Sequence, residues 1–122
     1  MKNVLSIIMI LILSMFLAGC DKDIEFVNNI APKADAGKDI NLTENETTEI
    51  VGKATAGDGE IVRVEWKEKS VLLSGQKKLL YTAPSKAGKH TFTFTVYDSN
   101  DKNDSDEMIV TVKEVIEVNA SK

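Results

Sequence analysis

Acidic and amide side chains gather in the polar stretch 98–107, where their oxygens could bind a calcium ion. Hard oxygen ligands at short spacing are what Ca²⁺ prefers. The candidate ligands are Asp98, Asn100 and Asp104, joined by Asp58 if its loop lies at the same end of the fold. The stretch does not match an EF-hand loop, because Lys102 takes the third ligand position and the following glycine is missing. The alternative interpretation is a solvated hairpin whose like charges repel.

His90 and Trp66 are the only histidine and the only tryptophan of the chain. His90 shares its parity with Phe92 and Phe94, so we expect it to point inward and to be a hydrogen-bonded structural residue. A catalytic base needs a nucleophile or a water and an orienting partner, and no serine or threonine lies in a recognisable nucleophile motif. A single histidine forms no zinc site without carboxylates. We therefore predict no catalytic residue, and no cofactor beyond the candidate Ca²⁺.

Two asparagines lie in N-x-S/T sequences, Asn41 and Asn103, each with an aspartate two residues earlier. The longer form resembles the acceptor of some bacterial oligosaccharyltransferases. Asn103 is the better candidate for glycosylation, because it is expected on a surface loop.

The elements that must position these residues are predicted to be short β-strands. Apolar and polar residues alternate with the two-residue period of half-buried strands. The pattern is clearest at 91–98, 108–112 and 62–67, weaker at 48–54 and 79–82, and a further short strand is expected at 39–43. Val62, Val64 and Trp66 are expected on one buried face. The polar residues 98–106 link two strongly patterned strands, which predicts a hairpin. About seven short strands with regular turn signals predict an all-β sandwich.

Several segments, in order, resemble those of a PKD domain, an immunoglobulin-like module. Residues 34–39 (ADAGKD) resemble the opening of the family, and residues 57–66 (GDGEIVRVEW) resemble its D-G-x-I-V-x-Y-x-W segment. Residues 81–84 (YTAP) and 88–99 (GKHTFTFTVYDS) resemble P…G-x-Y-T-F-x-L-T-V-x-D-S. The resemblance implies an antiparallel immunoglobulin-like sandwich over residues 34–115, and some PKD domains bind calcium.

This sequence departs from the PKD pattern at two places. The W-D-F-G-D-G of the family is absent after Trp66, and His90 stands where the family usually has tyrosine. Both differences indicate a divergent member.

The first twenty residues resemble a bacterial lipoprotein signal peptide. A basic start at Lys2 precedes an apolar run from Val4 to Leu17, which is shorter than the roughly 18 residues that a spanning helix needs. Leu17-Ala18-Gly19-Cys20 resembles a lipobox, which implies cleavage before Cys20 and lipid on its sulfur. A lone cysteine in an exported chain would otherwise be a reactive leftover. A secretory signal cut at residue 18 or 19, without lipid, is the alternative.

The chain is thus expected to divide into a signal peptide (1–19), a lipidated cysteine and tether (20–31), the sandwich domain (32–118) and a tail (119–122). A first edge strand at 24–27 is the alternative to part of the tether. Lipidation of Cys20 implies attachment to the cell membrane or the outer membrane, with the domain facing the periplasm or the cell exterior. Asp21 resembles the inner-membrane retention signal of enteric bacteria, a rule that varies between bacterial groups.

The formal net charge of the chain is −4, or −5 without Lys2, and no run of basic residues is present. This charge argues against a nucleic-acid partner. We predict a membrane-anchored, non-catalytic binding or spacer module that contacts an envelope protein or glycan. A structural accessory subunit of a larger envelope or secretion assembly and a calcium-dependent adhesion module are the alternatives.

Overall fold

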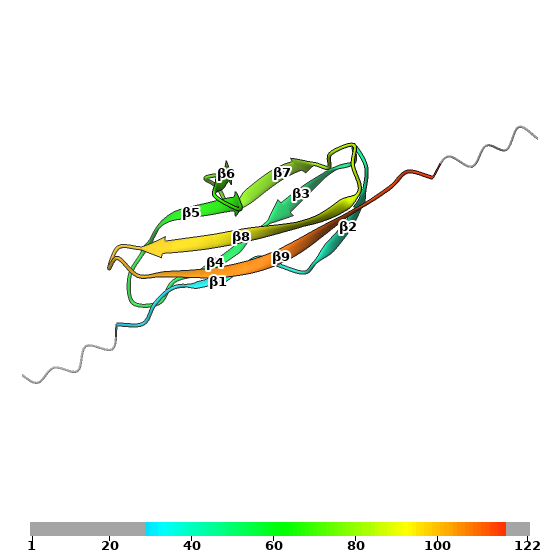
Figure 1. Ribbon diagram of the computed structural model, residues 1–122. Helices are drawn as coiled ribbons and strands as arrows, with labels where there is room; N and C mark the ends of the chain where they lie inside the picture. Colours follow the sequence, from blue (N-terminus) through cyan, green and yellow to red (C-terminus); the bar gives the residue numbers. More distant parts are fainter. Residues whose placement is uncertain (1–28, 117–122) are drawn as a thin grey trace, which may run out of the picture.

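The computed structural model describes residues 29–116, and this part of the chain forms nine β-strands (Figure 1). In chain order they are β1 (Lys33–Asp35), β2 (Ile40–Thr43), β3 (Thr47–Val51), β4 (Lys53–Thr55), β5 (Ile61–Glu68), β6 (Val71–Ser74), β7 (Lys78–Thr82), β8 (Gly88–Asp98) and β9 (Asn103–Lys113). Within residues 29–116, no helix is long and apolar enough to cross a membrane. Cys20, the segments 1–19 and 119–122, and the alternative strand at 24–27 lie outside the described residues.

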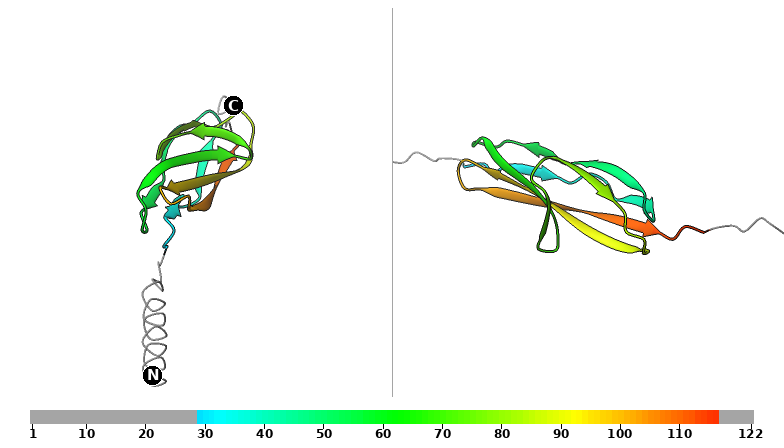
Figure 2. Two further views of the ribbon diagram at one scale, coloured as in Figure 1. Left: turned by 90° about the vertical axis from the view of Figure 1, so that its left-hand side faces the viewer. Right: turned by 90° about the horizontal axis from the view of Figure 1, so that it is seen from above.

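The strands form the two layers of a sandwich, seen edge-on in the right-hand view of Figure 2. One layer is a five-stranded sheet in the order β2-β9-β8-β5-β6, antiparallel except for β2, which runs parallel to β9. The other layer contains the antiparallel pairs β1-β4 and β3-β7. The all-β sandwich that the sequence predicts is confirmed.

A single glycine separates β3 from β4 and lets this layer pack closely on the other sheet. Gly52 is buried, and a Cβ at this position would lie 2.7 Å from the ring of Phe94. The alternating stretch 48–54 is therefore two strands with a break at Gly52 rather than the one strand expected.

The core lies between the layers and is formed by the inward residues of both. Trp66, Phe92, Phe94 and Val96 are fully buried, and the ring centroids of Trp66 and Phe94 are 4.8 Å apart. The indole Nε1 of Trp66 donates to the backbone oxygen of Lys77 at 2.9 Å, which satisfies its one polar group. Among residues 29–116, every buried apolar residue lies between Ala34 and Val112, so we expect residues 29–122 to fold on their own.

Two carboxylates of β9 connect the layers where β1 passes beside it. Asp106 Oδ2 accepts the backbone N–H of Ala36 at 2.7 Å, and Asp104 Oδ2 accepts that of Ala34 at 2.8 Å. Within the described part of the chain, β1 pairs through its backbone with β4 only, so these side chains take the place of a second strand at its other edge. They also block that edge against pairing with another chain.

Two details differ from the sequence prediction. Val62 is 62% exposed rather than buried, because the pairing of β5 with β8 shifts register between Ile61 and Arg63 and turns Val62 away from the core. The polar loop 98–106 is a short turn, since β9 already begins at Asn103. Asp101 closes this turn with a positive φ of 61°.

The two ends of the described chain lie at opposite ends of the sandwich, as Figure 1 and both views of Figure 2 show. At the first end, the backbone N–H and oxygen of Ile30 bond to the side chain and backbone N–H of Asp58 in the β4–β5 loop. At the other end, β2 and β9 pair in parallel from Ile40↔Val110 to Thr43↔Lys113.

Candidate functional site

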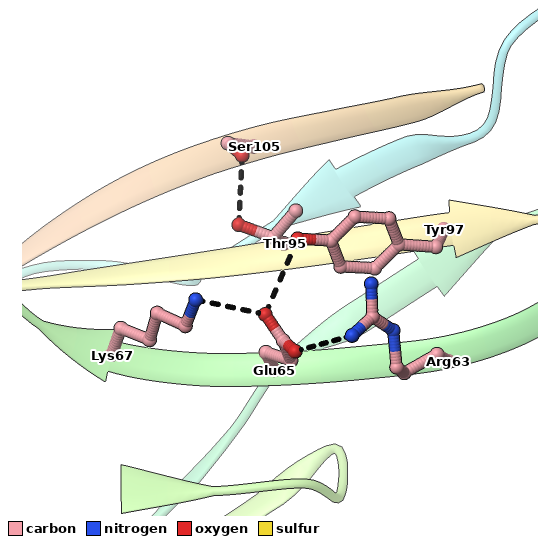
Figure 3. A network of polar contacts seen from close by, with 6 residues as sticks. All are labelled: Arg63, Glu65, Lys67, Thr95, Tyr97 and Ser105. Atoms are coloured by element: carbon pink, nitrogen blue, oxygen red, sulfur yellow. Dashed lines mark hydrogen bonds and ion pairs between the residues drawn. The ribbon is translucent and has the colours of Figure 1, made fainter. Parts of the chain in front are cut away.

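The outer face of the five-stranded sheet carries an ordered polar network around Glu65 (Figure 3). Arg63, Glu65 and Lys67 alternate with the buried residues of β5, so all three point away from the core. Strand pairing places Arg63 opposite Tyr97 and Glu65 opposite Thr95 on β8. The face is therefore built from two adjacent strands whose register sets the contacts.

Glu65 is only 9% exposed although it lies on the solvent side of the sheet. Its carboxylate accepts hydrogen bonds from Arg63 Nη1 at 2.8 Å and from the Tyr97 hydroxyl at 3.2 Å, and Lys67 Nζ lies 3.3 Å away. A charge removed from water is costly unless it is paired and hydrogen-bonded, and these three donors meet that requirement. The network therefore holds its side chains in fixed positions.

Arg63 also stacks on an aromatic ring. Its guanidinium carbon lies 3.8 Å from the centroid of the Tyr97 ring, which is a cation–π contact. The side chain is 56% exposed, so the guanidinium presents its remaining N–H groups to solvent in a fixed orientation.

A second polar cluster lies where β5 ends beside β8. His90 Nδ1 is 2.5 Å from Glu68 Oε2, and both side chains are partly buried. Tyr81 of β7 packs edge-on against Phe92, with ring centroids 4.8 Å apart. Burial raises the pKa of the Tyr81 hydroxyl above its usual 10.0, and the nearby negative charge of Glu68 raises that pKa further.

An open cavity of about 610 Å³ adjoins this cluster. Its lining comprises Glu68 and His90, the cationic Lys69 and Lys89, the hydroxyls of Thr91 and Thr93, and Glu107 of β9. Within residues 29–116 no serine or threonine hydroxyl is hydrogen-bonded to His90. The lining is thus made mainly of charged and hydroxyl-bearing side chains, which can donate and accept hydrogen bonds.

A family model described as "K319L-like, PKD domain" matches residues 36–112, well over half of the chain. The protein belongs to the K319L-like PKD domain family. The resemblance of the sequence to a PKD domain is thereby confirmed. PKD and fibronectin-III-like domains are typically non-catalytic.

Two solved structures show the same fold at low identity. The PKD domain from KIAA 1837 protein is 24% identical, with a TM-score of 0.54 over 71% of this chain and 91% of that one. The fibronectin(III)-like modules of Clostridium thermocellum CbhA are 24% identical, with a TM-score of 0.53 over 70% of this chain and 99% of that one. No curated protein sequence matches this chain.

The PKD fold brings part of the candidate calcium set together. A side chain at Gly59 would meet both Asn100 Nδ2 and Asp98 Oδ2, so the loop after Asp58 lies against the turn after β8. Asp98 is 2% exposed, and its Oδ1 accepts the backbone N–H groups of Asn100 and Lys102 at 2.9 and 2.8 Å. Its Oδ2 is buried without a hydrogen-bond partner in the described part of the chain.

The other two candidates already bond to backbone. Asp58 Oδ2 accepts the N–H of Ile30, and Asp104 Oδ2 accepts that of Ala34 on the far side of β9. Among the residues that the structure describes, no three His, Cys, Asp or Glu side chains are grouped so that they could hold a metal ion. The calcium site gains no support from this placement and stays a prediction.

The structure also shows where the other residues singled out in the sequence lie, namely Asn103, Trp66 and His90. Asn103 is the exposed first residue of β9 rather than a loop residue, and its glycosylation stays a prediction. Trp66 is a core residue, as expected. His90 points inward at the edge of the core and is hydrogen-bonded, which agrees with the structural role expected for it.

Sequence reasoning missed the residues that organise the outer face. The alternation in β5 indicates that Arg63 and Glu65 face solvent, but it does not show that Tyr97 lies across from them. That contact depends on the register between β5 and β8, which the irregularity after Ile61 shifts. The bonds from Asp104 and Asp106 to β1 are likewise not evident in the sequence, because the uniformly polar stretch 98–106 predicts a loop.

Proposed function

We propose that this PKD domain is a non-catalytic binding module that contacts an envelope protein or glycan. The observation that carries the proposal is the ordered Arg63–Glu65–Tyr97 network beside the open polar cavity. Fixed side chains on a solvent-facing surface lose little conformational entropy when a partner binds, which favours recognition. PKD and immunoglobulin-like domains are commonly binding or spacer modules.

We further propose that the domain is held at the cell membrane or the outer membrane, outside the cytosol, by lipid on Cys20. The apolar run before the Leu17-Ala18-Gly19-Cys20 sequence supports this assignment. Two or three acyl chains anchor a protein stably, since each buried methylene contributes about 0.8 kcal/mol. Labelled palmitate should enter the wild-type protein and not Cys20→Ser. A wild-type protein that takes up no fatty acid would show that the anchor is wrong.

Site-specific photocrosslinking in the native envelope tests the binding function. A photoreactive residue at Thr91, on the outer face of the five-stranded sheet, should trap a partner. The same residue at Thr55, exposed on the other layer, is the matched control. Crosslinks from neither position would contradict a binding module and favour a spacer. Crosslinks from both positions at fixed stoichiometry would favour an accessory subunit of a larger assembly.

A further inference from the structure

The outer face of the five-stranded sheet is basic although the chain as a whole carries a charge of −4. The strand registers place four cations on it, from Arg63, Lys67, Lys89 and Lys113. Glu65 and Glu107 are the carboxylates of this face, and Glu65 is paired with Arg63 and Lys67, so four positive and two negative charges leave a net charge of +2. Asp104 and Asp106 of β9 point away from this face and accept the backbone N–H groups of Ala34 and Ala36. A surface of one sign on a protein of the opposite net charge attracts anions locally.

The neutral positions of the same face carry mostly hydroxyl groups. Thr91, Thr93, Thr95, Ser105 and Thr111 point outward from β8 and β9, and Thr95 and Ser105 are hydrogen-bonded to each other at 2.8 Å. Hydroxyls both donate and accept hydrogen bonds, as the hydroxyls of a sugar do. A protein partner would more often require an apolar centre in its docking surface, whereas the apolar Ile109 of β9 and Leu72 of β6 are separated here by β8 and β5.

The cavity at the end of β5 is a concave site that is also lined by cations and hydroxyl groups. Lys69 and Lys89 supply cationic donors, whereas Glu107 and Glu68 supply acceptors. His90 also lines the cavity, and Glu68 holds its ring through Nδ1. A volume of about 610 Å³ lies within the range of small-ligand sites and exceeds that of one sugar ring.

The cations also follow a line along β5. Arg63 and Lys67 are four residues apart on one face of the strand, which corresponds to about 13 Å at the rise of a β-strand. Lys69 then follows at the cavity. An extended chain with a charge on each unit could contact these cations in succession, and the half-exposed Arg63 guanidinium has further N–H groups besides the one that bonds Glu65.

We propose that this face binds an acidic polysaccharide, a polymer of uronic acid units, that runs along β5 with one sugar in the cavity between Lys69 and Lys89. The proposal rests on the binding function proposed above and names the ligand class and the surface. The carboxylates of the polymer face the cations, and its hydroxyls face the threonine hydroxyls and Glu107. The face is not evident in the sequence as a basic cluster, because its cations come from separate strands.

Affinity electrophoresis and calorimetry on residues 29–122 test the proposal. Polygalacturonate should bind, neutral dextran should not, and binding should weaken as salt is raised. Polyglutamate has the charge without the sugar hydroxyls and should bind about tenfold more weakly than polygalacturonate. Equal binding of polyglutamate would show that the face recognises negative charge and not the sugar. Hyaluronan, a second polymer with uronic acid units, is tested in parallel, and failure of both polysaccharides to bind would overturn the proposal.

A pair of charge-matched variants locates the site. Lys69→Gln/Lys89→Gln should weaken polygalacturonate binding about tenfold, whereas Lys33→Gln/Lys53→Gln, on the other layer, should stay within about twofold of wild type. Equal loss in both variants would overturn the assignment to this face. If no polysaccharide binds but the photocrosslink from Thr91 persists, the binding function stands with a protein partner and only the ligand class is wrong.

Discussion

Truncation of Asp106 to alanine tests how far one side-chain hydrogen bond from β9 holds the end of β1 to the rest of the sandwich. The change removes the carboxylate that accepts the N–H of Ala36 at 2.7 Å. Ala36 is 1% exposed, so its N–H would be left buried without a partner. A hydrogen bond to a charged group contributes about 1.5–3 kcal/mol, and we expect Asp106→Ala to lose a free energy of unfolding in that range.

The loss should be visible as both a thermal and a local effect. For a domain of this size 1 kcal/mol corresponds to about 4–8 °C in melting temperature, so a fall of roughly 10 °C is expected. Native-state hydrogen exchange should show faster exchange at the amide of Ala36, while amides in the centre of β8 change only with global stability. Asp106→Asn keeps an acceptor oxygen and should lose less than half as much.

Glu107→Ala is the matched control, because the neighbouring residue has the same charge and faces solvent from the other side of β9. Its effect should stay within about 0.5 kcal/mol. The reasoning is refuted if Asp106→Ala is as stable as Glu107→Ala and the amide of Ala36 stays protected. In that case its pairing with β4, the bond from Asp104 and packing would be enough to hold β1.

Three further outcomes follow from the structure. The raised pKa of Tyr81 means that the folded state holds this proton more tightly, so stability should fall as the pH rises above about 10, and Tyr81→Phe should flatten that fall in alkaline unfolding curves. Gly52→Ala places a methyl group 2.7 Å from the ring of Phe94 and should cost about 1–3 kcal/mol in chemical denaturation; a neutral effect would mean that the ring moves aside freely. If the predicted calcium site exists, added Ca²⁺ should raise the melting temperature of the wild type and not that of Asp98→Asn, and an unchanged melting curve would remove the site.

The sequence predicted the strands whose inward residues are apolar. Phe92, Phe94 and Val96 alternate with threonines, and β8 follows that pattern to its end at Asp98. The first half of β9 escaped prediction because its inward residues are Asp104 and Asp106, so the usual alternation of apolar and polar residues is absent there. These carboxylates point inward to bond a neighbouring strand, which only the three-dimensional pairing reveals.

The candidate site was less predictable than the fold. The alternation in β5 predicts that Arg63 and Glu65 point outward, but their contact with Tyr97 on β8 depends on the register between the two strands. A one-residue shift in register moves every side chain to the opposite face. The local shift after Ile61 exposes Val62, which the two-residue alternation had placed in the core. The basic character of the outer face is hidden for the same reason, since Lys67 of β5 and Lys89 of β8 come onto one face only after these strands have paired.

The parallel pairing of β2 with β9 has a mechanical consequence. The described chain enters at one end of the sandwich and leaves at the other, so tension between its ends pulls these two strands lengthwise in opposite directions (Figure 1). The evenly spaced bonds between parallel strands then bear the load together in shear instead of opening one after another. A body loaded in this way resists stretching along its long axis, and the same contacts would yield more easily to a force applied sideways.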